Sequence, residues 1–241
     1  MLFKFFDKFI NKNAKYYDHY ISLGYNCECA YRFAMRHHFV EASLFTWANS
    51  INIKNLIKAL SDIDAVLGKE PEVSGVMWRC LNTDIRFHGT EPSSMHAHNE
   101  KYLAEDWEPY RKELVSRINH LKEKFKNQLS DHKKTLFTYT YRGGNGEEAR
   151  EVVNNIRLLK KTLEKAGANN FELLIILEKS KLQTEVELKD TGIYIRYVDE
   201  LAPEDAVTTK KYDKKSWRKI FREFKPNFKL KKRRKFKFED M

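Results

Sequence analysis

The chain has few cysteines, and they form no recognisable framework. Three cysteines in 241 residues are an odd number and are well spread, so a disulfide scaffold is not expected. Cys27 and Cys29 form a C-x-C pair, which is not a redox C-x-x-C motif, and no second cysteine pair completes a zinc site. We therefore expect a reducing, cytoplasmic compartment, and neither a metal nor another cofactor.

Long hydrophobic runs are also lacking. No apolar stretch approaches the roughly 18 to 20 residues that a membrane-spanning helix needs. The first residues do not resemble a signal peptide, because Lys4, Asp7 and Lys8 interrupt them and no small-residue cleavage site follows. With 41% hydrophobic residues, the chain can bury one good core, which predicts a single main domain.

Positive charge is in excess, with a formal net charge of +11. Much of it lies in residues 225–238, where Lys and Arg alternate with aromatic residues, a pattern suited to anionic lipid headgroups or phosphate backbones. The start of the chain has an apolar stripe opposite lysines, which is typical of an interfacial or core-docking helix. We expect an anionic membrane surface, on its cytoplasmic face, or a phosphate-bearing substrate as partner. Nucleic acid and a purely solvated tail are the alternatives.

Alternating strand and helix patterns fill the second half of the chain. The β-rich run 134–141 is followed by a helical pattern over 147–166, and continuous apolar strands follow at 171–177 and 193–198. Helices are further predicted at 51–67, which Ser50 could cap, at 100–129 and at 213–221, and short strands at 76–81 and 84–88. The pattern predicts an α/β fold with a mostly parallel sheet flanked by helices. We expect an amphipathic N-terminal helix (1–17), an α/β domain (18–222) and a basic tail (223–241).

The segment around Cys27 reads as strand, tight turn and helix. The apolar run Tyr20, Ile21, Leu23 stops at Gly24, and a helical pattern begins near Cys27. A thiol in the first turn of a helix lies near unpaired N–H groups and the positive end of the helix dipole, which favour the thiolate. Cys27 is therefore a candidate nucleophile, although buried cysteines more often serve as small apolar residues. Cys29 is expected to pack.

Two other clusters could contribute to a site. Arg142, Gly143 and Gly144 lie in a glycine-rich loop between a strand and a helix, where backbone N–H groups could hold a phosphate. The loop matches no dinucleotide or P-loop pattern, so a flexible connection is the alternative. His88, His96 and His98 lie close in sequence, but without a carboxylate or thiolate at ligand spacing they do not predict a zinc site.

Three pieces of sequence, Ser22-Leu-Gly-x-Asn-Cys27-x-x-Ala30, Phe45-x-Trp47 and Phe87-His88, resemble a bacterial family of unknown function described as papain-like cysteine peptidases. The resemblance covers most of residues 18–222. The family usually has Phe-Asp-Trp, whereas Thr46 replaces the acid here. If that Asp orients a catalytic histidine, this chain uses another group, and Asp84 and Asp213 are candidates by residue type.

The resemblance implies that Cys27 is the nucleophile and His88 the base, with Asn26 and the Cys27 N–H as oxyanion donors. Trp47, Arg142, Gly143 and Gly144 are expected to contact substrate. The first functional hypothesis is a cysteine-dependent hydrolase or acyl transferase. The second is a peripheral-membrane transferase of cell-surface polysaccharide assembly acting on a phosphate-bearing sugar or lipid, because members of the family often accompany such enzymes. The third is a nucleic-acid-binding module, for which no motif accompanies the charge.

Overall fold

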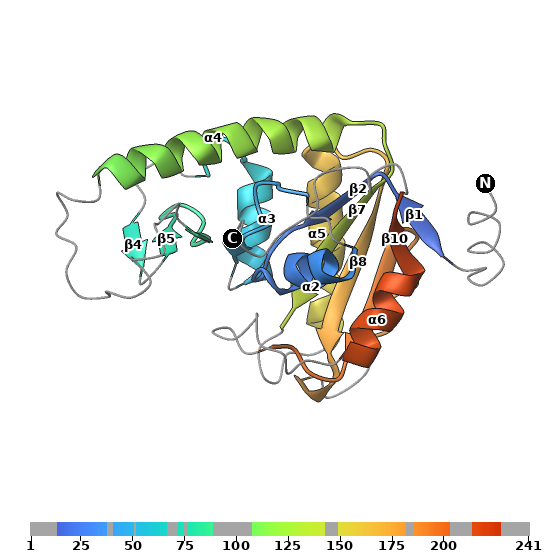
Figure 1. The fold of residues 1–241 in the computed structure, drawn as a ribbon. Helices are drawn as coiled ribbons and strands as arrows, with labels where there is room; N and C mark the ends of the chain where they lie inside the picture. Colours follow the sequence, from blue (N-terminus) through green and yellow to red (C-terminus); the bar gives the residue numbers. More distant parts are fainter. Residues whose placement is uncertain are drawn as a thin grey trace.

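The computed structural model describes residues 14–37, 41–50, 52–66, 72–74, 77–88, 108–142, 149–181, 186–202 and 214–227 (Figure 1). Its helices are α2 (Glu28–His37), α3 (Ile53–Ser61), α4 (Glu108–Ser130), α5 (Ala149–Lys165) and α6 (Lys214–Glu223), with a 3-10 turn at Lys179–Lys181. Its strands are β1 (Lys15–Tyr17), β2 (His19–Ser22), β3 (Ala48–Asn49), β4 (Glu72–Ser74), β5 (Met77–Arg79), β6 (Arg86–His88), β7 (Thr135–Tyr141), β8 (Phe171–Glu178), β9 (Ile193–Val198) and β10 (Phe224–Pro226).

A four-stranded parallel sheet in the order β2-β7-β8-β9 forms the centre of the fold. All of β7 is buried, and so are the last six residues of β8, because helices cover both faces of these middle strands. Strands buried on both faces read as continuous apolar runs, which is why the sequence pattern identifies them. The predicted α/β class with a parallel sheet flanked by helices is confirmed.

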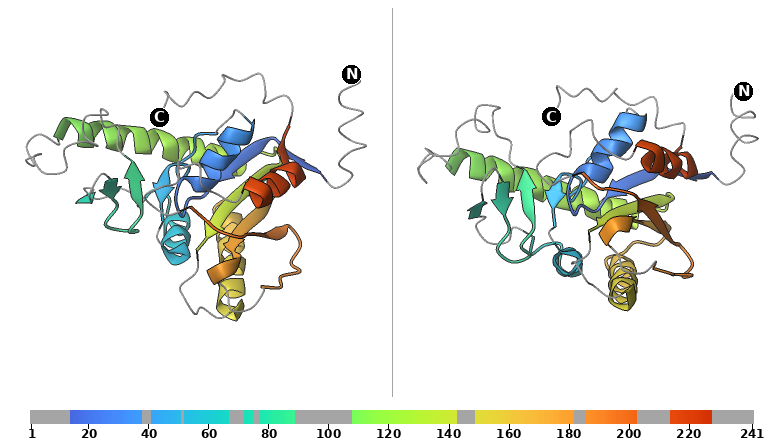
Figure 2. Two further views of the ribbon diagram at one scale, coloured as in Figure 1. Left: turned by 60° about the horizontal axis from the view of Figure 1, so that its bottom comes forward. Right: turned by 90° about the horizontal axis from the view of Figure 1, so that it is seen from below.

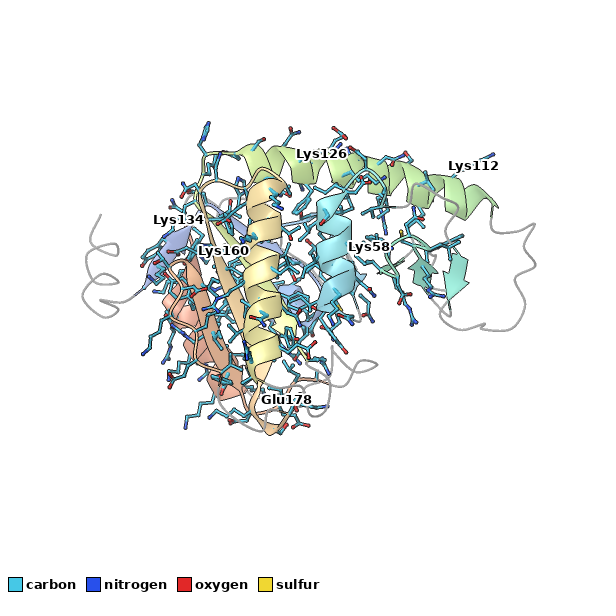
Figure 3. All side chains as sticks on the ribbon, turned by 180° about the vertical axis from the view of Figure 1, so that it is seen from behind. Lys58, Lys112, Lys126, Lys134, Lys160 and Glu178 are labelled. Atoms are coloured by element: carbon cyan, nitrogen blue, oxygen red, sulfur yellow. The ribbon has the colours of Figure 1, made fainter. Side chains whose placement is uncertain are left out.

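Alternate strand residues face two different helical layers. Phe137, Tyr139 and Leu173 pack with α3, α4 and α5, whereas Leu136 and Leu174 pack with α2 and α6. Figure 1 shows α2 and α6 in front of the sheet, and Figure 3 shows α3 and α5 from the other side. The domain is therefore a three-layer arrangement with a separate apolar core on each face of the sheet.

A second, antiparallel sheet in the order β3-β6-β5-β4 lies beside the first, and α4 runs above both (Figure 1). Its buried Trp78 and Phe87 join the core under α3 and α4. Two of its strands, β5 and β6, lie within predicted strands, whereas β3 and β4 were not expected. Two or three residues are too few to show the alternation that marks a strand in sequence, and β5 and β6 were identified only as parts of longer predicted strands.

The first and last described strands form a third, two-stranded sheet. β1 and β10 pair in parallel, and the Asn227 N–H donates to the Tyr17 carbonyl at 2.7 Å. Figure 2 shows α6 leading into this sheet beside α2. The expected domain boundaries at residues 18 and 222 leave out both strands. The rest of the amphipathic N-terminal segment and of the basic tail lies outside the described residues.

The helix predicted at 51–67 is shorter than expected. Its N-cap is Asn52, whose side chain accepts a hydrogen bond from the Lys54 N–H at 2.8 Å, and the helix ends at Ser61. Ser50, the expected cap, accepts instead from the Tyr25 N–H at 3.2 Å. In the portion of the chain that the structure describes, none of the helices is long and apolar enough to cross a membrane.

Candidate functional site

A tight turn connects β2 to α2 and carries the predicted nucleophile. Gly24 (φ 90°) and Tyr25 (φ 61°) both adopt the left-handed region, which is uncommon for a tyrosine. A Cβ atom on Gly24 would lie 3.2 Å from the Ala48 carbonyl oxygen. The turn therefore needs glycine for two reasons, its backbone conformation and the close approach of β3.

Asn26 and Cys27 directly precede helix α2. The Asn26 Oδ1 accepts a hydrogen bond from the Glu28 N–H at 3.0 Å, and the Cys27 carbonyl accepts from the Tyr31 N–H at 2.9 Å. The predicted strand-turn-helix arrangement is confirmed, with Cys27 at the first turn. Cys27 is partly exposed, whereas Cys29 and Cys80 are buried. The Cys29 thiol lies 3.3 Å from the Thr138 hydroxyl and packs as expected.

The electrostatics of Cys27 differ from the expectation. Burial raises the pKa of its thiol, and the neighbouring Glu28 carboxylate acts in the same direction. A backbone N–H and the Arg32 guanidinium oppose this shift but do not reverse it. Burial also raises the pKa of the Cys29 thiol, to about 12. The position at a helix start is thus not enough to make Cys27 a thiolate, and a reactive Cys27 needs a base.

Glu28 is a fully buried carboxylate that the sequence reading missed. Its two oxygens accept from the Ala202 N–H at 3.1 and 3.2 Å, and it is paired with Arg142 at 3.1 Å and Arg32 at 3.5 Å. Burial raises the pKa of the Glu28 carboxyl, and the Ala202 N–H and both guanidinium groups counter that shift. The sequence contained one sign of this role: Glu28 is an acidic residue in the first turn of a helix whose neighbouring residues are mostly apolar.

Arg142, a predicted substrate contact, connects three elements at the carboxyl end of the sheet. Following β7, it is paired with Glu28 and donates to the Ala202 carbonyl, beyond β9. Its guanidinium carbon lies 5.2 Å from the centre of the Tyr25 ring. Within the described residues, the buried Arg142 Nε and Asn26 Nδ2 have no hydrogen-bond acceptor. Gly143 and Gly144 lie outside the described residues.

His88 ends strand β6 of the antiparallel sheet, and Trp47 directly precedes strand β3. Ala48 pairs with Phe87 and Asn49 with Arg86, so Trp47 and His88 adjoin the same strand pair, and His88 itself pairs with Met77. Trp47 is partly exposed, and the structure describes the backbone but not the side chain of His88. Two other histidines lie at the ends of β2 and α2 that are away from the turn: His19 begins β2, and His37 ends α2.

The structure does not bring Asp84 or Asp213, the two candidates for a third catalytic group, to a histidine in the described residues. Asp84 is paired with Arg79 and accepts a long hydrogen bond from Asn55, and Asp213 is outside the described residues. Thr46 stabilises its own turn, because its hydroxyl accepts from the Ser43 N–H at 2.9 Å and donates to the Glu41 carbonyl at 3.0 Å. No group of His, Cys, Asp and Glu in the described ranges could hold a metal ion.

Comparison of the chain with protein-family models, with curated proteins and with solved structures finds no match.

Proposed function

We propose that the chain is a cysteine-dependent hydrolase or acyl transferase, with Cys27 as the nucleophile and His88 as the general base. The observation that carries the proposal is the contact between the Cys27 turn and the strand pair holding His88. Gly24 closely approaches the Ala48 carbonyl, and Ala48 pairs with Phe87, the neighbour of His88. Residues 27 and 88, distant in sequence, thus belong to adjoining segments.

The raised pKa of the Cys27 thiol makes the base necessary. An imidazole takes the thiol proton, and the thiolate attacks the carbonyl carbon of an ester, thioester or amide. The leaving group departs with a proton from the imidazolium and leaves an acyl-thioester on Cys27. Water or another acceptor then attacks the thioester and releases the acyl group, and the thiol is restored.

Two donors near the thiol suit the developing oxyanion. The Asn26 Nδ2 has no acceptor within the described residues, while its Oδ1 is held at the start of α2. The Cys27 N–H lies at the helix start, where backbone donors have no intrahelical partner. Donors fixed before the reaction stabilise the transition state without reorganisation.

Alkylation of the thiol tests the pair without a known substrate. Iodoacetamide labelling of Cys27 would be followed by mass spectrometry between about pH 5 and pH 10. Because burial raises the pKa of the Cys27 thiol, we expect labelling to depend on the base, and to rise at a higher pH in His88→Asn than in the native protein. Identical profiles for the native protein, His88→Asn and the exposed control His120→Asn would exclude the pair.

Turnover tests the reaction itself. A panel of activated esters and thioesters should show an initial burst of leaving group and a Cys27-bound acyl group detectable by mass. Cys27→Ala should abolish both, whereas Cys29→Ala in the core should retain them at reduced stability. Turnover that survives in Cys27→Ala would contradict a covalent thiol mechanism.

The second candidate is a peripheral-membrane transferase of cell-surface polysaccharide assembly that acts on a phosphate-bearing sugar or lipid. The Arg142 Nε, buried without an acceptor in the described part of the chain and close to the start of α2, favours it. A nucleoside-diphosphate sugar should then raise the melting temperature of the native protein and of Cys27→Ala equally, and not of Arg142→Gln. The absence of any shift in the native protein would exclude it.

A further inference from the structure

Helix α6 has an outward face of one charge sign. Its buried residues Trp217, Ile220 and Phe221 pack on the sheet. Its exposed charged residues are all basic: Lys214, Lys215, Arg218, Lys219 and Arg222. The one acidic residue of the helix, Glu223, is partly buried and paired with Arg196. Such a helix presents a band of positive charge to its surroundings.

Helix α2 lies beside α6 in the same layer and extends this face (Figures 1 and 2). Its last turn exposes Arg36 and Met35, the latter with 43% of its surface accessible. Its one acid, Glu28, is fully buried. Neither helix therefore exposes an aspartate or glutamate, and the α2/α6 face, defined by Arg36, Met35 and the five basic residues of α6, is cationic.

The opposite layer differs. On α5, the exposed basic residues Arg150, Arg157, Lys161 and Lys165 are interspersed with Glu151 and Glu164, and Arg157 is paired with Asp190. Figure 3 shows this side, with α5 and α3 in front of the sheet. Both helical layers therefore expose lysine and arginine, but only the α2/α6 layer does so without exposed acidic residues among them.

Both ends of the described chain join the domain next to the α2/α6 face. α6 leads directly into β10, which pairs with β1, and the Lys225 ammonium lies 5.8 Å from the centre of the Tyr16 ring. The sequence before β1 contains Phe3, Phe5, Phe6 and Phe9 among lysines. The sequence after β10 has seven lysines and arginines between residues 229 and 237, with Phe228, Phe236 and Phe238 among or beside them.

We propose that the α2/α6 face docks on an anionic lipid bilayer. Clustered basic residues are attracted to anionic headgroups, and this attraction acts within a Debye length of the surface. The exposed Met35 and the phenylalanines of the flanking sequences favour a bilayer over duplex nucleic acid, because apolar side chains can insert at the headgroup boundary, whereas the bases of a duplex are already stacked on one another. Several weak signals in one molecule bind more firmly than each alone.

Vesicle co-sedimentation of the full chain tests the location of the binding face. The vesicles contain phosphatidylcholine alone or with about 30% phosphatidylserine, and the triple variant Lys215→Glu/Arg218→Glu/Lys219→Glu reverses the α6 face. The matched control, Arg150→Glu/Lys161→Glu/Lys165→Glu, makes the same change in net charge on α5. Circular dichroism and thermal melting establish that both variants are folded.

We expect the native protein to bind only the vesicles with phosphatidylserine and to be released by salt. The α6 variant should lose at least about tenfold in partitioning, and the α5 control no more than about threefold. Equal losses in the two variants, or no binding by the native protein, would overturn the proposal. So would duplex DNA that displaces the native protein from vesicles at equal phosphate concentration.

Discussion

At the scale of single residues, the main feature is Glu28, a carboxylate with 0% of its side chain exposed. It connects the start of α2 with Arg32, with Arg142 after β7 and with the Ala202 N–H after β9. Removing one partner of a buried ion pair leaves the others uncompensated, which costs more than the pair itself contributes. Glu28 therefore fixes the carboxyl end of the sheet, where the candidate site lies.

The substitution Glu28→Gln should lower the free energy of unfolding by about 2–4 kcal/mol, because two buried guanidinium groups lose their countercharge. Urea denaturation measures this loss. As a control, Glu151→Gln removes a carboxylate whose side chain is 52% exposed and paired with Lys54; it should cost at most about 0.5 kcal/mol. Equal effects of the two substitutions would contradict a structural role for Glu28.

A second buried ion cluster lies at the start of β2. The His19 Nδ1 is 2.6 Å from Glu41, and its Nε2 is 3.1 Å from Asp131. The hydrogen bond to Glu41, supported by both carboxylates, raises the pKa of His19 above its usual 6.5 despite burial. Hydrogen bonds from Lys133 and His19 lower the pKa of Asp131.

Because its pKa is raised in the folded state, protonated His19 stabilises the fold fully below about pH 6.5 and progressively less as pH rises through the folded pKa. We expect the unfolding free energy to fall over this interval and His19→Phe to flatten the dependence. Urea denaturation at successive pH values measures it. The exposed control His120→Asn should keep the native slope, and a slope unchanged in His19→Phe would contradict the assignment.

At the scale of elements, the turn between β2 and α2 determines where Cys27 lies. Gly24→Ala should destabilise the protein by about 2–3 kcal/mol, because it combines a positive φ with a Cβ 3.2 Å from the Ala48 carbonyl. Gly167→Ala is the matched control, since Gly167 also has a positive φ but nothing within 4 Å of an added Cβ. We expect it to cost about 1 kcal/mol.

Thermal or urea unfolding measures the loss of stability in each glycine variant. The difference between the two losses is the contribution of the contact with β3, separated from that of the backbone strain. If Gly167→Ala costs as much as Gly24→Ala, the close approach of β3 contributes nothing. Labelling of Cys27 by iodoacetamide in Gly24→Ala then reports whether the turn has moved relative to the thiol.

The sequence predicted the long elements and missed four of the short strands. β7, β8, β9, α5 and α6 have patterns long enough to identify, with ends within two or three residues of those observed. β1, β3, β4 and β10 contain only two or three residues each, and their pairing depends on segments far away in the chain. Local patterns contain no information about such partners.

The same distinction applies to the candidate site. The Gly24–Cys27 turn was predicted from the glycine and from the change to a helical pattern near Cys27, and the structure confirms the turn and the helix start. The direction of the Cys27 pKa shift could not be predicted from the sequence, because it depends on burial by distant segments. The ion pairs of Glu28 join residues 28, 142 and 202, whose proximity only the sheet order creates.

At the scale of the whole molecule, the domain is completed by its last described strand. Phe224 is fully buried and packs near Tyr17, with ring centres 6.3 Å apart, and near Tyr194 at 5.3 Å. A chain comprising residues 14–227 should therefore keep the native melting temperature. A chain comprising residues 14–223 should lose about 3–5 kcal/mol, as for removal of a buried aromatic side chain.

Differential scanning calorimetry of the two truncated chains measures the contribution of β10. Phe224→Ala in the full-length protein is the matched variant and should reproduce most of the loss. If residues 14–223 melt like residues 14–227, the β1–β10 sheet does not stabilise the domain, and the boundary near residue 222 suggested by the sequence would describe the folding unit better.

The pairing of β1 with β10 also has a consequence for how the protein is made. Asp18 accepts a hydrogen bond from Asn227, 209 residues later, so this contact has one of the largest possible loop-closure distances in the chain. During synthesis, β2, β7 and β8 can assemble early, but the core around Tyr17 stays incomplete until α6 and β10 have left the ribosome. We expect a nascent chain that ends before Phe224 to expose part of this core to water, which makes such chains prone to aggregation.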